Sequence, residues 1–186
     1  MTKKLTFFAV FLIGFIIFIS ATYAATYLNV SLSPNTPAGG YISATSTNVA
    51  LVSFDFQNTA SSTDNIIIDK IVIYNTGTSS STPRVFDNLY LYDQENLIAT
   101  SSNRIYNYFV FNGFEFVIST TTVKTLTVKG DLGMGAIPGQ TIIIGLENNQ
   151  RVRGWDQSTY QASSTPAFVS GDFPINGNAF TIISPI

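Results

Sequence analysis

The chain contains no cysteine and no histidine among its 186 residues. Without cysteine no disulfide can form, so a hydrophobic core has to stabilise the fold. The absence of histidine removes the usual general base of enzymes and the commonest ligand of transition metals. A nucleophilic mechanism would need a Ser–Lys pair or carboxylates, and Lys70, Lys124 and Lys129 fall in expected strands with no motif around them. We therefore expect that the protein is not an enzyme.

Charged residues are also scarce, at 11% of the chain, and the formal net charge is −2. Without Lys3 and Lys4 the nine basic residues become seven against eleven acidic ones, a net charge of −4. This balance argues against binding to nucleic acid, which requires basic patches. Ser, Thr and Asn supply the surface polarity instead, a composition typical of extracellular β-proteins.

The N-terminal segment, residues 1–24, has the pattern of an export signal. Two lysines precede the apolar run Leu5–Ile19, and Thr22 and Ala24 occupy the small-residue positions of a cleavage site. The run is short for a membrane span, which takes about 20 residues. We expect a cleaved signal that leaves a single domain, 25–186. A retained membrane anchor and a pilin-like filament helix are the alternatives, and only this apolar run would contact a membrane.

The rest of the chain predicts β-strands and no helix, because no window sustains apolar residues at a 3.6-residue period. Asn48–Gln57 alternates, with Val52 and Phe54 toward the core and Ser53 toward solvent. Asn65–Asn75 is apolar at nearly every position, which predicts a central strand covered on both faces or a bulge near Asp69.

Phe109–Phe116 predicts a hairpin, because Asn112-Gly113 between aromatic runs favours a type I′ turn. The neighbouring stretch Val117–Leu132 predicts a core strand with Val123 among its buried residues. Asn148–Ala167 predicts an irregular segment. The other expected strands are Thr26–Ser33, Tyr41–Ala44, Asn88–Asp93, Leu97–Thr100, Thr141–Glu147 and Ala179–Ile183. Together these patterns predict an all-β fold, an antiparallel two-sheet sandwich of about eight to ten strands.

The order of several short motifs carries a resemblance to a known family. The motifs are Leu32–Gly39, Val49–Phe56, Asp69–Thr78, Asn88–Asp93, Lys124–Leu132 and Asn176–Ile182. In this order they resemble the Ser/Thr-rich immunoglobulin-like modules of bacterial cell-surface and secreted proteins, over about residues 28–183. The resemblance implies an immunoglobulin-like sandwich that serves as a wall, stalk or adhesive unit and has no catalytic residues to transfer.

Two groups of side chains are candidates for ligand binding. Trp155 lies between Arg153 and Asp156, with Arg151 close by, and these residues could form a sugar platform in a loop. Alternatively, the indole caps the core and its N–H bonds to a loop carbonyl. Tyr90 and Tyr92 alternate with inward leucines and could form an exposed tyrosine face with Tyr106 and Tyr108. Such a face would serve either cross-strand stabilisation or an interface.

Loop carboxylates are the weakest candidates. Asp87, Asp93 and Glu95 offer hard oxygen ligands for a structural Ca²⁺, but no calcium-loop spacing surrounds them. We therefore expect no catalytic metal and no cofactor beyond a possible structural calcium.

The function expected from these patterns is that of an exported surface protein that acts without catalysis. Its partners would be other surface proteins, further copies of itself or glycans, in a secreted or cell-surface location. Self-assembly could proceed through an edge strand, either Ala25–Ser33 or Ala179–Ile183. A carbohydrate-binding module centred on Trp155 is the alternative.

Overall fold

The computed structural model describes residues 27–59, 64–101, 104–105, 107–158 and 166–185. The expected signal or anchor segment lies outside these residues. Within the described ranges, no helix is long and apolar enough to cross a membrane.

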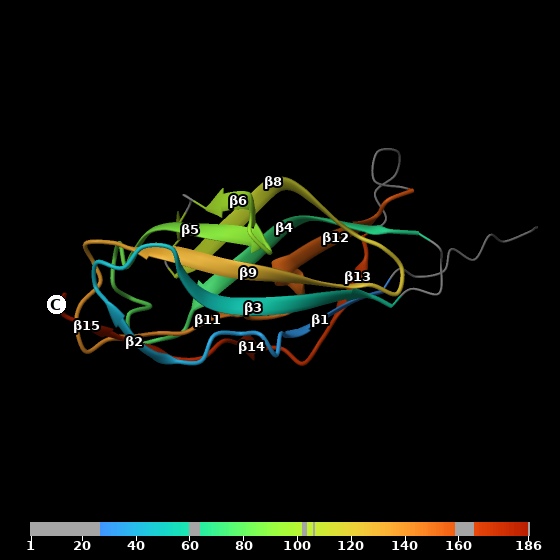
Figure 1. Cartoon of the computed structure of the whole chain (residues 1–186). Coiled ribbons are helices and arrows are strands. Elements are labelled where there is room, and N and C mark those ends of the chain that lie inside the picture. The colour runs from blue at the N-terminus through green and yellow to red at the C-terminus, as the bar shows by residue number, and fades with distance from the viewer. Residues whose placement is uncertain (1–26, 60–63, 102–103, 106, 159–165, 186) are drawn as a thin grey trace, which may run out of the picture.

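The described residues form an all-β, sandwich-like fold of three sheets (Figure 1). Sheet I runs in the order β13 (Phe168–Ser170), β1 (Tyr27–Leu32), β3 (Val49–Asn58), β9 (Val123–Leu132), β5 (Phe86–Asp93) and β6 (Asn96–Ser101). Sheet II runs in the order β14 (Ile175–Asn176), β11 (Ile144–Leu146), β4 (Ile66–Asn75), β8 (Tyr108–Ile118) and β7 (Arg104–Ile105), and β12 (Val152–Asp156) also pairs with β4. Sheet III contains β10 (Thr141–Ile142), β15 (Phe180–Ile183) and β2 (Gly40–Ser43).

The main core lies between sheets I and II, where the inward faces of both sheets are aromatic and aliphatic. Its largest fully buried side chains are Phe54, Phe56, Phe111, Leu28, Leu51, Ile66, Ile68, Ile71, Ile73, Leu89, Leu91 and Ile118. Burial of such side chains contributes roughly 1.5–3 kcal/mol each relative to exposure. Because no cysteine is present, this packing is the principal source of stability.

Strand β3 confirms the expected alternation with one correction. Val52 and Phe54 are buried as predicted, but Ser53 is also buried, at 3% exposure. The chain after β1 runs alongside β3 here, and the Thr36 hydroxyl donates to the Ser53 carbonyl at 2.8 Å. The Ser53 hydroxyl pairs with that of Thr127 at 2.9 Å, so the polar residue is buried with its partners.

Strand β4 confirms both features predicted for it. It lies between β8 on one side and β11 and β12 on the other, and it is buried on both faces. Its register with β8 and with β12 shifts around Asp69, so this residue sits in a bulge. The bulge turns the Asp69 carboxylate toward β12.

The predicted Asn112-Gly113 hairpin is wrong. Strand β8 runs unbroken through both residues and pairs with β4 along its length. Gly113 has a φ of 73°, whereas Asn112 is not in the left-handed region that a type I′ turn requires at both positions. Gly113 therefore lies in a bulge opposite Asp69. The hairpin of this region joins β7 to β8.

The stretch Val117–Leu132 is divided between the two sheets. It contains the end of β8 and the whole of β9, which pairs with β3 and β5 and not with β8. Val123 is 53% exposed and not buried as predicted, because it points to the outer face of sheet I at the start of β9. The turn Asp93–Asn96 and the return strand β6 agree with the prediction.

Several other expectations about strands need correction. Part of Asn148–Ala167 is regular, since β12 pairs with β4, and Thr141–Glu147 is divided into β10 and β11. Such divisions give more strands than the eight to ten expected, in three sheets and not two. The sheets are also not wholly antiparallel, because β1 pairs with β13, and β15 with β2, in parallel.

The two strands expected at sheet edges lie inside their sheets. Strand β1 lies between β13 and β3, and β15 lies between β10 and β2. Strand β1 pairs with β13 only over Tyr27–Asn29, because β13 is short, and Val30–Leu32 pair with β3 alone.

Candidate functional site

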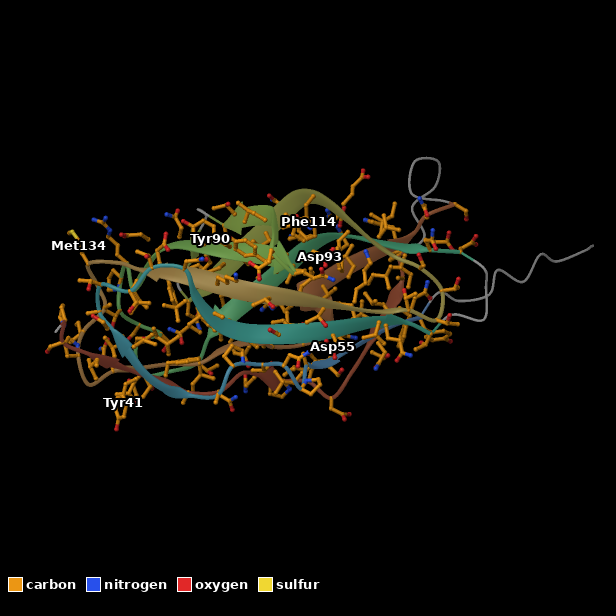
Figure 2. The ribbon with its side chains drawn as sticks, in the orientation of Figure 1. Tyr41, Asp55, Tyr90, Asp93, Phe114 and Met134 are labelled. Carbon is orange, nitrogen blue, oxygen red and sulfur yellow. The ribbon has the colours of Figure 1, made fainter. Side chains whose placement is uncertain are left out.

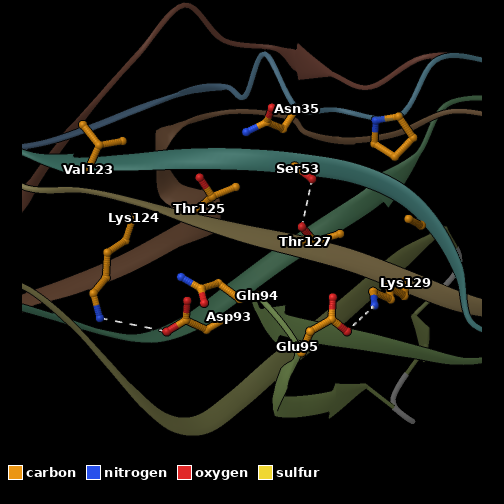
Figure 3. Close-up of a pocket in the computed structure, with 12 residues that line it drawn as sticks. Asn35, Ser53, Asp93, Gln94, Glu95, Val123, Lys124, Thr125, Thr127 and Lys129 are labelled. Carbon is orange, nitrogen blue, oxygen red and sulfur yellow. Dashed lines mark hydrogen bonds and ion pairs between the residues drawn. The ribbon is translucent and has the colours of Figure 1, made fainter.

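A polar groove with a volume of about 700 Å³ lies on the outer face of sheet I (Figure 3). Its floor comes from β3 and β9, one wall from the loop after β1, and the other wall from the turn between β5 and β6. Its polar lining includes Asn35, Glu95, Lys124, Thr125, Thr127 and Lys129. This volume falls within the range of about 300–1,000 Å³ that is usual for ligand sites.

The floor of the groove is held in place by hydrogen bonds between neighbouring strands. The Thr125 hydroxyl donates to the Asp55 carboxylate at 2.6 Å. The hydroxyls of Thr127 and Ser53 lie 2.9 Å apart. Asp55 lies directly opposite Thr125, and Ser53 opposite Thr127, in the pairing of β3 with β9, so the sheet itself sets these distances. The floor therefore presents hydroxyl oxygens in fixed positions.

Two lysines along the groove each face a carboxylate of the Asp93–Asn96 turn. The Lys124 ammonium lies 4.0 Å from Asp93 and the Lys129 ammonium lies 3.8 Å from Glu95. Both separations are longer than a direct hydrogen bond of about 2.7–2.9 Å between charged groups. The Glu95 side chain is 94% exposed, whereas that of Lys129 is 16% exposed. Two cations and two anions in loose pairs therefore line the groove, and the Lys124 ammonium also lies over the ring of the buried Phe116, 4.9 Å from its centroid.

The predicted tyrosine face is only partly present. Tyr90 and Tyr92 do point outward from β5, with their rings edge to face at 6.5 Å, and Figure 2 labels Tyr90 on this strand. The Tyr90 hydroxyl donates to Asp131 at 2.6 Å, and this hydrogen bond raises the pKa of Tyr90. The Tyr92 ring lies under the Lys129 ammonium, 4.4 Å from its centroid. Tyr108 belongs to sheet II, and Tyr106 is outside the described residues.

On the opposite face of the sandwich, Arg153 and Trp155 are brought together with Asp69. Two guanidinium nitrogens of Arg153 donate to Asp69 at 2.7 and 2.8 Å, and the indole N–H of Trp155 donates to it at 3.0 Å. The Arg153 guanidinium also lies 5.6 Å from the centre of the Trp155 ring. The Arg153 guanidinium and the Trp155 indole N–H of the predicted sugar platform are therefore both hydrogen-bonded to the carboxylate of Asp69 on β4. Trp155 also lies on a strand and not in a loop as predicted.

Arg151 belongs to a second cluster on the same face. It donates to the Glu147 carboxylate through Nε at 2.9 Å and through a second guanidinium nitrogen. Its guanidinium lies 4.5 Å from the centre of the Tyr108 ring, which stacks in turn on Tyr74 at 6.2 Å. The hydrogen bonds from Arg151 and Tyr108 hold the pKa of Glu147 below its usual range. Arg151 therefore has a different carboxylate partner from Arg153 and does not join the cluster around Trp155.

The remaining sequence candidates lie apart from these clusters. Asp156 is 8% exposed, and one of its oxygens accepts from the Ser158 hydroxyl and backbone N–H. The calcium candidates face cations: Asp87 lies 3.8 Å from Arg84, and Asp93 and Glu95 face the two groove lysines. Within the described part of the chain, no three acidic side chains gather in a way that could hold a metal ion.

Sequence reasoning missed the groove because its lining comes from four separate segments with no shared motif. The available signal was weak: the outward positions of β9 are Thr125, Thr127 and Lys129, a polar row on one side of an alternating strand. The chain matches no protein-family model, and no curated protein is significantly similar to it. The site is therefore interpreted from its own geometry.

Proposed function

We propose that this chain is an exported, non-catalytic cell-surface protein that acts by binding through its surface, as an immunoglobulin-like module does. The observation that carries the proposal is the open polar groove on sheet I, which presents fixed hydroxyls and paired charges over about 700 Å³ of a sheet face. A recognition surface needs a stable scaffold with polar groups of defined position, and here both come from the same β-strands.

The placement of the charged side chains supports a non-catalytic role. Lys124 and Lys129 each face a carboxylate, Asp93 and Glu95 respectively. Arg153 and Arg151 are bonded to Asp69 and Glu147 within the sheet II face. These groups hold strands and turns together, and such ion pairs are common in structural surfaces.

Export and surface location are supported by the sequence. The charged, apolar and small-residue order of residues 1–24 has the form of a secretory signal. The surface draws its polarity from Ser and Thr, and the sandwich-like fold is of the kind used by many cell-surface domains. A pilin-like subunit with a retained N-terminal helix remains the alternative, and the mature N-terminus distinguishes the two.

The test is to produce the full chain with a C-terminal tag in a bacterial host. We expect N-terminal sequencing to find a mature chain that begins at Ala25, and the tag to appear in the medium or to be removed by protease added to intact cells. An uncleaved chain assembled into filaments would favour the pilin-like alternative. A tag that stays in the cytosolic fraction, protected from protease until the cells are lysed, would contradict the proposal.

A further inference from the structure

We propose that the groove on sheet I binds a neutral, hydroxyl-rich polysaccharide chain. This inference rests on the proposed surface function and adds the chemical class of the ligand and the residues that recognise it. It also moves the glycan site from Trp155 to the opposite face of the sandwich.

The balance of charge in the groove favours a neutral ligand. Lys124 and Lys129 are offset by Asp93 and Glu95, so the lining has no net charge. An anionic polymer would meet the two carboxylates, and a cationic ligand would meet the two ammonium groups. The low overall charge of −2 adds no attraction for a polyanion.

The mixture of donors and acceptors fits hydroxyl groups in particular. A hydroxyl can donate one hydrogen bond and accept others, so it can bridge an ammonium and a carboxylate that face each other. In the two ion pairs the ammonium nitrogen lies 4.0 Å and 3.8 Å from the carboxylate oxygen. The lysines belong to β9 and the carboxylates to the turn between β5 and β6. The amide of Asn35 and the hydroxyls of Thr125 and Thr127 add further partners on the other wall and the floor.

Tyr92 fixes the position of one of these donors. The Lys129 ammonium rests over its ring, 4.4 Å from the centroid, and the side chain is 16% exposed. A lysine held in this way has lost much of its conformational freedom before the ligand arrives, which lowers the entropic cost of binding. Opposite it, Glu95 is 94% exposed and free to adjust. The groove therefore combines a fixed donor with a movable acceptor.

An extended peptide fits the groove less well. Peptides that bind to β-sheets usually add as a strand to an edge and use backbone hydrogen bonds. The strands beneath the groove, β3 and β9, lie inside sheet I and are paired on both sides. An apolar ligand also fits poorly, because charged, amide and hydroxyl side chains dominate the lining.

The test is affinity electrophoresis of the purified full chain through gels that contain mannan, dextran or a soluble β-glucan. Heparin gels and a soluble Ser/Thr-rich peptide, the latter in a titration, serve as comparisons. We expect retardation by at least one neutral polysaccharide. Replacing Glu95 by Gln or Lys129 by Met is expected to weaken that binding about tenfold, the usual cost of losing a hydrogen bond to a charged group.

The matched control is Glu115→Gln, which removes the same charge from an exposed carboxylate on β8 of sheet II. This variant should bind like the unchanged chain. Glu95→Gln should retain the wild-type unfolding midpoint because the side chain is almost fully exposed, so its result stands even if Lys129→Met folds poorly.

Three results would overturn the inference: no retardation in any neutral gel, retardation that Glu95→Gln leaves unchanged, or preferential binding of heparin or the peptide. The proposed function fails separately, through a cytosolic location of the chain. A surface-located protein without polysaccharide binding would therefore reject only the ligand class.

Discussion

The two outer faces of this sandwich carry similar charged residues but arrange them differently. On sheet I, Lys129 and Glu95 form a pair 3.8 Å apart above a hydroxyl-lined groove. On sheet II, Arg153 donates two hydrogen bonds of 2.7 and 2.8 Å to Asp69, beside the Trp155 ring. The charged groups of the first pair are separated and exposed on one side, whereas those of the second are bonded directly to each other.

The difference follows from the chemistry of the cations and from the backbone beneath them. Arginine offers a planar fork that fits a carboxylate in two places and stacks on aromatic rings, whereas lysine offers a flexible point charge. The bulge at Asp69 also turns a carboxylate of the central strand toward its arginine. The carboxylates that face the two groove lysines belong instead to Asp93 and Glu95, at the turn between β5 and β6. We infer that the sheet II face contributes mainly stability and that the sheet I face is available for recognition.

The largest effect on stability should come from Asp69→Ala on sheet II. Asp69 is 8% exposed and accepts from Arg153 and from the Trp155 indole. Its removal takes away two hydrogen bonds of Arg153 and one of the Trp155 indole, at a cost of about 2 kcal/mol after allowance for the half-exposed Arg153. Urea unfolding should show a lower midpoint with an unchanged slope.

The matched variant on sheet I is Glu95→Ala. Its carboxylate is 94% exposed, so the free energy of unfolding should change by less than about 0.5 kcal/mol. Equal losses in the two variants would show that the faces do not differ in the way proposed here.

A smaller effect is expected when the bulge opposite Asp69 is strained. Gly113 has a φ of 73°, and no atom lies within 4 Å of the position that a Cβ would take. Gly113→Ala should therefore cost only the backbone term, about 1 kcal/mol. Gly40→Ala is the control, because its Cβ also meets open space and its φ lies outside the left-handed region. Thermal unfolding of both variants would compare them, and an equal cost at Gly40 would rule out the backbone explanation.

The smallest effect is a dependence on pH that belongs to the sheet II face. Arg151 holds the pKa of Glu147 below the usual 4.5, so in the folded state this carboxylate keeps its charge to lower pH than in the unfolded state. Its contribution to stability is therefore present above pH 4.5 and lost as the pH falls through the folded pKa. Glu147→Gln should lose this part of the acid dependence in denaturant titrations. An identical pH profile in the variant would show that the pair contributes nothing to stability.

The local pattern of the sequence was enough to predict part of the fold. Alternation identified the buried faces of β3 and β5, and the nearly continuous apolar run of β4, interrupted at Asp69 and Lys70, indicated a central strand or a bulge near Asp69. The failures came where backbone conformation and distant pairing decide the result. Asn112-Gly113 can serve a hairpin or a bulge, and only the pairing of β8 with β4 determines which.

The candidate sites depended even more on distant pairing. Asp69 lies 84 residues from Arg153, so no local motif shows that the two meet. The sequence did place Arg153 and Trp155 at one site, because the two residues are close in the chain, but it expected a loop where the structure has β12. It could not predict that Arg151 would join a different cluster, or that a turn at Glu95 would stand beside the hydroxyls of β9.

The contrast between the two faces is tested most directly by NMR titration of the isotope-labelled full chain with neutral oligosaccharides prepared from the polysaccharide that retards it. If the groove on sheet I binds the oligosaccharide, changes in amide chemical shift should concentrate at Thr125, Thr127, Lys129 and the turn at Glu95, and the Trp155 indole signal should not move. Shifts centred on Trp155 and Arg153, or no shifts at saturating oligosaccharide, would contradict it.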